Sequence, residues 1–333
     1  MAWRRLLGFC VGVFFAAVFA ACGGNGQERE VFAPGSHGCL AVGHIRFMND
    51  NLYGRAPFTY RELEAANWIV EQLLAMGYEW GDIEVQEFYW HDPDVARRME
   101  VWADFIDDSS KLIWGEWERR DFSQNVILTV AGQSERKIVV GAHYDTWDLP
   151  GASDNASGVA LLLESARRLM DLENYYTIVY VFFGAEEIGL VGAYVFLDSL
   201  SQEQRDNIVL MINADVLLEG PDLAYGAGYR RGADMAARQN DLTRQVDEIA
   251  REIYRDFGAL FHSRPNMINS GSDHLPFLEA GFTVMFMASL GTTRIHHTER
   301  DCLNYLNENW SGMVEENMRN ASIFLERMIL EIK

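Results

Sequence analysis

Short hydrophobic runs recur through the middle of the chain and predict the strands of a buried sheet. Each run has five to seven residues and is rich in β-branched and aromatic side chains, as is typical of strands covered on both faces. These runs lie at residues 126–130, 137–142, 177–183, 208–212 and 283–287. Residues 83–88 instead alternate between apolar and polar side chains, which indicates a strand with one exposed face.

The segments between these runs carry hydrophobic residues at helical spacing. The clearest helix follows Thr59, which forms a capping-box pattern with Glu62, and it ends at Gly77. Further helices are predicted at residues 156–172, 190–200, 241–257 and 308–332. Residues 92–120 are charged and aromatic without a clean period, so they predict no definite element, and a hairpin is one alternative.

Strands that alternate with helices predict a sheet with helices on both of its faces. The expected fold class is therefore α/β, a three-layer αβα sandwich around a mostly parallel mixed sheet. No segment rich in Pro, Gly or Ser divides residues 40–333, so we expect a single domain with its N-terminal part packed onto it. In such sheets ligands bind beyond the carboxyl ends of the strands, and the polar residues there become the candidates for function.

The first 21 residues have the pattern of a signal peptide. A pair of arginines precedes an apolar run of 16 residues, which is short for a bilayer span and ends in small residues. The sequence FAAC at residues 19–22 resembles a bacterial lipobox, which predicts export to the cell envelope or periplasm and membrane attachment through a lipidated Cys22. Simple cleavage and secretion is the alternative. Residues 22–35 would then be a flexible tether and residues 36–333 the folded domain.

Composition and charge narrow the range of partners. Of the 333 residues, 49% are hydrophobic and 23% are charged, which is typical of a globular protein and excludes disorder for most of the chain. The formal net charge of −21 makes nucleic acid an unsuitable general partner, because the surface repels phosphate backbones. The same charge tolerates cationic partners, including the α-amines of peptides.

Two cysteines remain for the folded domain once the N-terminal segment is set aside. Cys39 and Cys302 form an even pair in a chain that we expect to be exported, where disulfides are stable. A disulfide between them and two unpaired buried thiols are equally consistent with the sequence, because their separation in space is not determined by it.

Residues that can bind a metal ion follow three successive predicted strands. The candidates at these strand ends are His143 with Asp145, Glu186 with Glu187, and Asp215; Asp154 and His297 lie outside the strands. Because the carboxyl ends of parallel strands meet at one edge of a sheet, we expect these side chains to lie close together. Surface charges placed by chance would not follow strand ends in this way. Histidine and carboxylate ligands without cysteine are typical of catalytic zinc.

Each candidate also has a structural alternative. His143 could be a core histidine, but Asp145 follows it at i+2 on the same side of a strand, where it can orient the imidazole. Glu186 and Glu187 could form a solvated helix start, yet adjacent side chains diverge, so that one can bind a metal while the other reaches the attacking water. Asp154 could cap the helix that follows it. An unpaired carboxylate at the end of a buried strand, as at residue 215, would be costly and therefore indicates a partner.

Several segments, in a consistent order, resemble the zinc aminopeptidases of the M28 peptidase family. The strongest matches are GAHYDT at residues 141–146, GASDNASGVA at residues 151–160 and FGAEEIGLVGA at residues 183–193. SQNV at residues 123–126, GSDHLPF at residues 271–277 and the segment 297–301 also match. The resemblance extends over about residues 40–330. It implies the zinc-exopeptidase fold, which is similar to that of phosphorylases and other hydrolases.

The resemblance also implies roles for the candidate residues. Two zinc ions would be bridged by Asp154, with His143 and Asp215 on one ion and Glu187 and His297 on the other. Glu186 would be the general base, and Asp145 would orient His143. Residues Asp273 and His274 fall in a matching segment, but the resemblance implies no ligand role for them.

His296 departs from the family pattern. Members often have tyrosine directly before the last histidine ligand, where it helps to stabilise the tetrahedral oxyanion. An imidazole can also donate a hydrogen bond, but from a different distance and with its own titration, so we expect an altered specificity or pH dependence. The alternative is that His296 faces away from the site.

These observations predict a zinc-dependent exopeptidase that removes N-terminal residues from peptides with a free N-terminus. Glutaminyl-peptide cyclotransferases resemble the same fold and are the alternative, although the GASDNASG segment and His296, where cyclases tend to have tryptophan, favour the peptidase. A scaffold protein descended from such enzymes is the third hypothesis, and it fits poorly because every ligand and Glu186 are present. The oligomeric state and the preferred N-terminal residue are not determined by the sequence.

Overall fold

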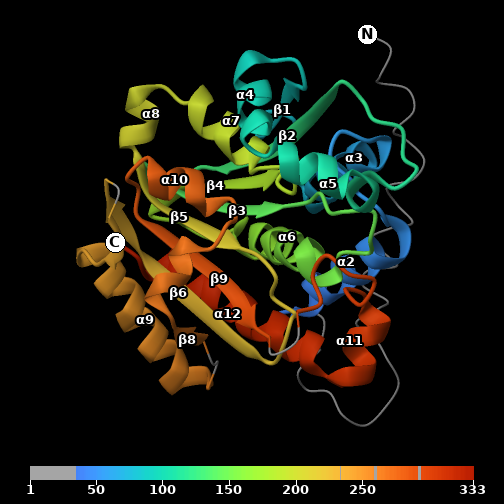
Figure 1. Cartoon of the computed structure of the whole chain (residues 1–333). Coiled ribbons are helices and arrows are strands. Elements are labelled where there is room, and N and C mark those ends of the chain that lie inside the picture. Colours follow the sequence, from blue (N-terminus) through green and yellow to red (C-terminus); the bar gives the residue numbers. More distant parts are fainter. Residues whose placement is uncertain (1–34, 233, 259–260, 292–293) are drawn as a thin grey trace.

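The structure is a computed structural model that describes residues 35–232, 234–258, 261–291 and 294–333. Within these residues nine strands form one sheet in the order β1-β2-β4-β3-β5-β9-β6-β7, and β8 pairs with β6 (Figure 1). The strands are β1 (Ile83–Tyr89), β2 (Phe122–Val130), β3 (Ser134–His143), β4 (Tyr176–Phe183), β5 (Ile208–Ala214), β6 (Asp222–Arg231), β7 (Asp234–Arg238), β8 (Phe261–Ser263) and β9 (Val284–Leu290).

Helices cover both faces of the sheet. They are α2 (Cys39–Asn51), α3 (Tyr60–Met76), α4 (Pro93–Val101), α5 (Ala103–Trp114), α6 (Ser157–Leu169), α7 (Val191–Ser199), α8 (Gln202–Asp206), α9 (Asp241–Phe257), α10 (His274–Glu279), α11 (Leu303–Asn309) and α12 (Met313–Glu331), with short turns η3 (Ala152–Ala156) and η4 (Pro265–Asn269). Helices α2, α3, α6, α9 and α12 contact one another on one face, whereas α7, α8 and α10 lie on the other (Figure 1). The predicted three-layer α/β fold is therefore confirmed.

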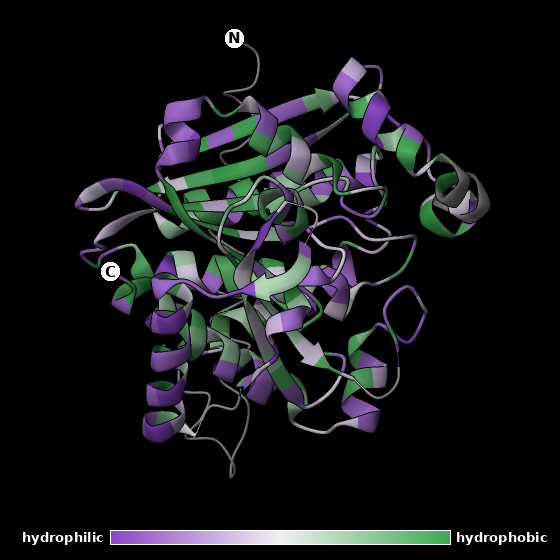
Figure 2. Cartoon of the chain, turned by 60° about the vertical axis from the view of Figure 1, so that its left-hand side comes forward, coloured by the Kyte–Doolittle hydropathy of each residue, from purple (hydrophilic) through white to green (hydrophobic). Residues whose placement is uncertain are grey.

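The parallel part of the sheet is its middle. Strands β4, β3, β5 and β9 run parallel, and antiparallel pairs flank them through β2 on one side and β6 on the other. In β3, Ile138 and Val140 face the larger core beneath α6, while Val139 faces the smaller core beneath α7. In Figure 2, hydrophobic residues are concentrated in the central strands and hydrophilic residues on the outer helices.

The register of the central strands brings their carboxyl ends together. His143, the last residue of β3, pairs with Phe183, the last residue of β4. Gly141 of β3 pairs with Asn213 of β5, so the segments that follow all three strands leave the sheet at the same edge. The sheet therefore positions the residues after β3, β4 and β5 side by side.

Two predicted segments differ from the structure. Residues 92–120 form helices α4 and α5 rather than a hairpin, with few buried positions, such as Val95 and Met99, to reveal their period. The predicted helix at 308–332 is two helices, because the chain turns at Gly312, which has a left-handed φ of 82°. The sequence analysis predicted no element at helix α2, although this helix buries Ile45 and Met48.

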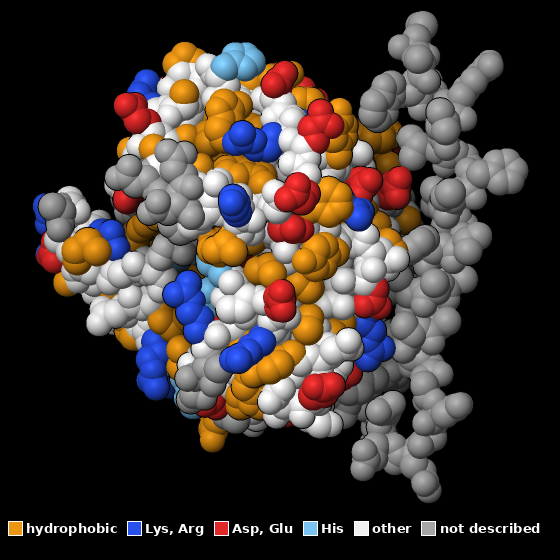
Figure 3. Space-filling view, turned by 45° about the vertical axis from the view of Figure 1, so that its right-hand side comes forward, with side chains coloured by type: hydrophobic (Ala, Val, Ile, Leu, Met, Phe, Trp, Pro, Cys, Tyr) orange, Lys and Arg blue, Asp and Glu red, His pale blue; other side chains and the backbone are white. Residues whose placement is uncertain are grey.

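The cysteines and the N-terminal segment can be compared with their predictions only in part. Cys302 is a free thiol, so the structure lacks the considered disulfide between Cys39 and Cys302. The structure does not describe residues 1–34. The signal peptide, the lipobox with Cys22 and all but the last residue of the tether (residues 22–35) therefore lie outside the described residues. Among the helices of the described part, none has the length and apolar composition needed to cross a membrane. On the face shown in Figure 3, acidic and basic side chains are intermingled despite the negative net charge.

Candidate metal-binding active site

The carboxyl ends of β3, β4 and β5 bring the predicted ligands into two overlapping groups. The side-chain donor atoms of His143, Glu186 and Asp215 lie within 4.8 Å of one another, and so do those of His143, Asp154 and Glu187. Except for Glu186, which is partly exposed, these side chains are buried. The convergence expected from the strand ends is thus present in the structure.

The two carboxylate oxygens of Asp154 face two different histidines. Oδ1 of Asp154 lies 3.1 Å from Nε2 of His143, which is also 3.3 Å from Oδ1 of Asp215. Oδ2 of Asp154 lies 3.2 Å from Nε2 of His297, which is also 2.8 Å from Oε2 of Glu187. The five residues therefore form two histidine–carboxylate pairs that share one carboxylate.

The sequence indicated that Asp145 orients the imidazole of His143, and in the structure the closer contact comes from its backbone. The Nδ1 of His143 is 3.1 Å from the backbone oxygen of Asp145, while the nearer carboxylate oxygen is 3.7 Å away. The Asp145 carboxylate instead accepts hydrogen bonds from the backbone N–H groups of Glu186 and Glu187, at 3.0 and 3.1 Å. Asp145 thus orients His143 mainly through its backbone and holds the Glu186–Glu187 turn with its side chain.

Burial and crowding shift the titration of the candidate ligands. Burial, reinforced by the neighbouring Asp154, raises the pKa of Glu187 to about 7. Burial opposes a charge on His297, but Glu187 and Asp154 raise its pKa to about 11. Burial also opposes ionisation of Asp154, yet hydrogen bonds with His143 and His297 hold its pKa well below the usual range. The site thus concentrates negative charge that it must balance locally.

The donor set fits a divalent metal ion. Two imidazoles and three carboxylates face one another, a combination that catalytic zinc accepts, whereas the site contains no thiolate. Oε1 of Glu187 is buried and has no hydrogen-bond partner among the residues that the structure describes. An unpaired buried carboxylate oxygen is costly, and coordination of a cation would satisfy it.

Glu186 is the partly exposed carboxylate at the edge of this cluster. Its donor atom lies within 4.8 Å of those of His143 and Asp215, whereas Glu187 faces Asp154 and His297, so the two adjacent carboxylates reach different parts of the site. Loss of hydration, together with the charges of Asp273 and Glu187, raises the pKa of Glu186 well above its ordinary value, although His143 opposes the shift. A carboxylate with a raised pKa that remains accessible is a better proton acceptor than an ordinary carboxylate and can return the proton.

Left-handed backbone occurs beside the candidate residues. Ala185 (φ 54°) precedes Glu186, Val216 (φ 51°) follows Asp215, and His297 itself has a φ of 57°. This conformation is unfavourable for residues with a Cβ, above all for a β-branched valine. Strained backbone that recurs at one site is typical of functional positions, because the surrounding structure must hold it in place.

His296 is held by a residue that the sequence did not reveal. Its Nδ1 lies 2.8 Å from Oε1 of Glu219, and this oxygen also accepts the backbone N–H groups of Ile295 and His296. The His296 ring meets the His297 ring edge-on, with centroids 5.2 Å apart, and is partly exposed. The structure therefore directs one nitrogen of His296 at Glu219 and places its ring beside the cluster.

Further residues contact the candidate ligands. Some of them lie in segments that resemble the family, and others do not. Ser272 donates a hydrogen bond of 2.7 Å to Oδ2 of Asp215, and Trp147 stacks on His297 with ring centroids 4.1 Å apart. Asp273 is fully buried, and neither of its oxygens has a hydrogen-bond partner in the described part of the chain. His274 bonds to the backbone oxygen of Ile268 and carries a structural role. The segment GSDHLPF signalled Ser272, whereas no local pattern signalled Trp147.

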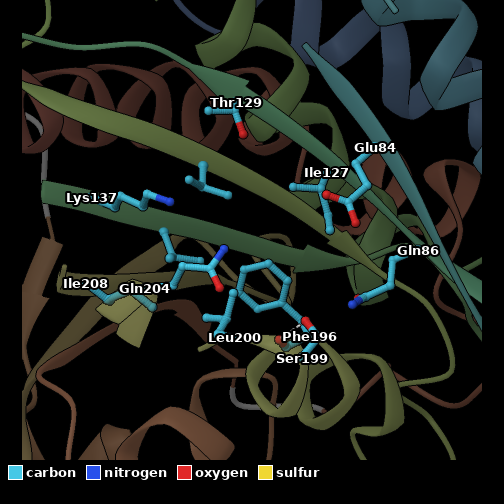
Figure 4. A pocket seen from close by; sticks show the side chains of 12 residues that line it. Glu84, Gln86, Ile127, Thr129, Lys137, Phe196, Ser199, Leu200, Gln204 and Ile208 are labelled. Carbon is cyan, nitrogen blue, oxygen red and sulfur yellow. Dashed lines mark hydrogen bonds between the residues drawn. The ribbon is translucent and has the colours of Figure 1, made fainter. Parts of the chain in front are cut away.

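A separate cavity of about 320 Å³ lies between the sheet and helices α7 and α8, in the half of the sheet that holds the amino ends of β3 and β5 (Figure 4). Its lining comes from β1 to β5 and from α7 and α8: Glu84, Gln86, Ile127, Thr129, Lys137, Val139, Val179, Phe196, Ser199, Leu200, Gln204 and Ile208. This lining includes none of the candidate ligands. Its charged side chains, Glu84 and Lys137, are at least partly exposed to solvent.

Comparisons with known proteins identify the family of the chain. Residues 125–322 match the family model described as Peptidase family M28. Aminopeptidase YwaD of Bacillus subtilis is 32% identical over 146 residues, which are 43% of this chain and 30% of that protein. The chain spans about a third to a half of the length of the curated relatives that it matches, at 47%, 30% and 44%.

Two solved structures share the fold. BSAP, a zinc aminopeptidase from Bacillus subtilis, superimposes with a TM-score of 0.67 at 17% identity, covering 90% of this chain and 95% of that one. A glutaminyl cyclase from an Acidobacteriales bacterium gives 0.64 at 19% identity, covering 92% and 99%. At these identities the likeness shows the fold alone.

Proposed function

Because the chain belongs to peptidase family M28, we propose that it is a zinc-dependent aminopeptidase that removes N-terminal residues from peptides. The observation that carries the proposal is the pair of histidine–carboxylate groups that share Asp154, one on each of its oxygens. His143 and Asp215 would hold one zinc ion, Glu187 and His297 a second, and Asp154 would bridge them. The buried, otherwise unpartnered oxygen of Glu187 supports this assignment.

Glu186 would move the proton in this reaction. When bound, the zinc ions supply Lewis acidity that polarises the scissile carbonyl and lowers the pKa of water. Glu186 stands beside His143 and Asp215, remains partly exposed and has a raised pKa. It would accept a proton from the attacking water and return it to the leaving amine. Asp145 would keep Glu186 in place through the backbone N–H that it accepts.

His296 would assist at the substrate oxygen. Its Nδ1 would donate to Glu219, so Nε2 would donate a hydrogen bond to the developing oxyanion only while the imidazole is protonated. Burial opposes this protonation, but the hydrogen bond with Glu219 raises the pKa of His296. Substrates would be peptides with a free N-terminus, whose cationic amine suits the acidic site. Loss of His296 would lower turnover and change the pH profile without removing metal.

The peptidase would act outside the cytoplasm. Residues 1–21 would direct export, Cys22 would carry lipid, and residues 22–35 would tether a peptidase domain of residues 36–333 to the envelope. Because the lipid would be attached to Cys22, Cys22→Ser would release the protein from membranes. Equal membrane association of Cys22→Ser and the original chain would contradict lipid attachment at this position.

Glutaminyl cyclisation is the second candidate, because a glutaminyl cyclase shares the fold with a TM-score close to that of the aminopeptidase. Cyclisation releases ammonia from an N-terminal glutamine and leaves the peptide length unchanged. The two activities therefore give products of different mass from the same peptide.

One experiment tests both functions. The purified protein is incubated with zinc and a mixed peptide library, with N-acetylated copies and peptides that begin with glutamine, and products are followed by mass spectrometry. Loss of one N-terminal residue, abolished by a chelator and absent from acetylated peptides, is the expected result. Loss of ammonia from glutamine peptides alone would assign the chain to the cyclases.

A further inference from the structure

The bridging candidate Asp154 lies in a segment without a strand or α-helix to support it. The turn η3 connects the loop after β3 to α6, and the dihedral angles of Asp154 itself are non-helical, with φ −112° and ψ 90°. One backbone hydrogen bond closes this turn, from the N–H of Ala156 to the oxygen of Gly151 at 3.0 Å, and it does not involve Asp154 itself. Its position must come from the side chains that contact this segment.

Arg55 is one of these side chains, and it is fully buried. Nε of Arg55 donates to the backbone oxygen of Tyr144 at 2.7 Å, and Nη2 donates to that of Gly151 at 3.1 Å. Nη1 donates to the oxygens of Leu52 and Pro150, each at 2.9 Å. A single guanidinium thus joins the two ends of the loop between His143 and Asp154.

This arrangement is unusual for a buried cation. Buried guanidinium groups are normally paired with a carboxylate, yet within the described residues Arg55 makes four bonds to carbonyl oxygens and no ion pair. Burial lowers its pKa to about 10, opposed by the charges of Asp301, Asp145, Asp154 and Glu187. Arg55 therefore remains a cation at neutral pH, beside the anionic cluster.

Gly151 makes the close approach of Arg55 feasible. Its φ of 58° is left-handed, and a Cβ there would lie 2.5 Å from the backbone oxygen of Asp154 and 2.9 Å from Nη2 of Arg55. Any side chain at residue 151 would push the guanidinium away from the turn. The glycine and the arginine therefore fit each other.

Asp301 holds the opposite side of the same turn. Its Oδ1 accepts the backbone N–H of Ser153 at 2.6 Å, and its Oδ2 accepts that of Asp154 at 2.9 Å. Its backbone oxygen accepts the N–H of Ala152 at 3.2 Å. Asp301 is 1% exposed, so water does not compete for these bonds. Arg55 thus holds carbonyl groups of the segment, and Asp301 holds its N–H groups.

We propose that Arg55 and Asp301 form a clamp that sets the position of Asp154 and thereby the zinc affinity of the site. Both are positioning residues, because they contact the backbone around Asp154 and not the substrate. The inference rests on the proposed zinc site. It adds a function for Arg55, which lies outside the part of the chain that matches the family.

The charge of Arg55 allows geometry and electrostatics to be separated. As a nearby cation, Arg55 repels zinc, so its removal would strengthen zinc binding if charge alone mattered. As part of the clamp, Arg55 orders the ligand, so its removal would weaken zinc binding. Arg55→Met removes the charge and the four bonds, whereas Arg55→Lys keeps the charge but cannot reproduce the planar fork.

The test measures zinc affinity by competition with a chromophoric chelator. We expect Arg55→Met and Arg55→Lys both to bind zinc about 10- to 100-fold more weakly than the original protein, as for other residues that orient metal ligands. Arg46→Met, which removes an exposed arginine paired with Glu315, is the matched control and should bind normally. Unchanged or tighter binding by Arg55→Met, or normal binding by Arg55→Lys, would overturn the proposal.

A second variant protects the test against misfolding. Asp301→Asn keeps an oxygen for one of the two N–H groups, and circular dichroism of the metal-free forms checks that each variant is folded. Asp301→Asn should weaken zinc binding about 10-fold, and it serves as the test if Arg55→Met does not fold. Failure of the original protein to bind zinc would instead overturn the proposed function, and the clamp with it. Normal zinc binding by the original protein and by folded Asp301→Asn would overturn the clamp alone.

Discussion

The half of the central sheet at the carboxyl ends of its parallel strands differs from the half at their amino ends in how far charged side chains are buried. Beyond the carboxyl ends of the parallel strands, His143, Asp154 and Glu187 are buried and point at one another. Near the amino ends, Glu84 and Lys137 line the cavity (Figure 4), where Glu84 is exposed and Lys137 partly exposed. Burial of charge is costly unless a partner compensates for it, whereas solvated charge costs little. The buried cluster therefore indicates chemistry, and the open cavity with its solvated charges does not.

The same contrast appears between histidines of the site and a histidine of the core. His143 and His297 sit among carboxylates, which raise the pKa of both. His44, in α2, packs edge-on against Trp68, and neither ring nitrogen has a hydrogen-bond partner among the described residues. Burial lowers the pKa of His44 to about 4. Burial alone thus keeps a histidine neutral, and only convergent carboxylates make it part of a charged site.

The largest effect is expected from removal of the shared carboxylate. Asp154→Ala should lose zinc and with it all measurable peptidase activity, because both histidine–carboxylate pairs depend on Asp154. Zinc content after dialysis, measured by elemental analysis, checks this. Glu84→Ala removes a carboxylate from the open cavity and should leave zinc and activity unchanged. A full zinc complement in Asp154→Ala would contradict the bridging role.

Glu186→Gln should separate proton transfer from metal binding. Turnover should fall by about 10²- to 10⁴-fold, the usual contribution of a general base, while both zinc ions remain. Steady-state kinetics and zinc analysis on one preparation give the two quantities together. Glu84→Gln is the matched control in the cavity. A Glu186→Gln enzyme with the original rate would show that the assigned mechanism is wrong.

His44 should make the fold sensitive to acid. Its folded-state pKa of about 4 lies below the ordinary value of 6.5, so the unfolded chain binds more protons between these values. Stability should therefore fall as pH decreases from about 6.5 to 4, by about 3 kcal/mol in total. Urea unfolding of the original protein and His44→Leu at pH 7 and pH 4.5 measures the difference. Parallel losses in both proteins would contradict the assignment to His44.

A smaller effect on the site is expected from replacement of Trp147, which stacks on the ring of His297. Trp147→Leu removes the face-to-face contact with His297 and should lower zinc affinity or kcat/KM about 10-fold. Trp147→Phe keeps a ring and should retain most of both. Equal losses in the two variants would indicate general damage to packing instead of lost stacking.

The smallest effect is expected at the cavity. Lys137→Met replaces a partly exposed cation, and it should change the free energy of unfolding by no more than about 0.5 kcal/mol and leave activity as it was. Thermal unfolding and the peptide assay measure both. A large loss of activity in Lys137→Met would break the contrast between the two halves of the sheet.

Most of the fold followed from local patterns. The predicted strands at 137–142 and 177–183 lie within β3 and β4, and the helix predicted at 241–257 has the same bounds as α9. Helices α4 and α5 were missed because their few buried side chains belong to a cluster completed by residues distant in sequence, such as Ile188 and Val191. Strand β6 was also missed, and its pairing with β9 joins segments far apart in the chain.

The sequence by itself determined which residues form the cluster. His143, Glu187 and Asp215 follow buried apolar runs, and the end of a run is a local property that can be read without knowledge of the fold. Asp154 and His297, which lie outside the strands, were candidates as well, and the resemblance to a known family suggested roles for all five residues. These roles stay proposals until metal binding and turnover are measured.

Only the tertiary structure decided how the cluster is held. Arg55 and Asp301 meet the segment around Asp154 from positions about 100 and 150 residues away, and Glu219 reaches His296 across 77 residues. No periodicity connects such positions, because their contact depends on the order of strands in the sheet and the path of the loops. Local patterns record which face of a strand or helix is buried. The partners of a buried charge are decided only when distant segments pack together, since the cost of burying it must be met within a few ångströms.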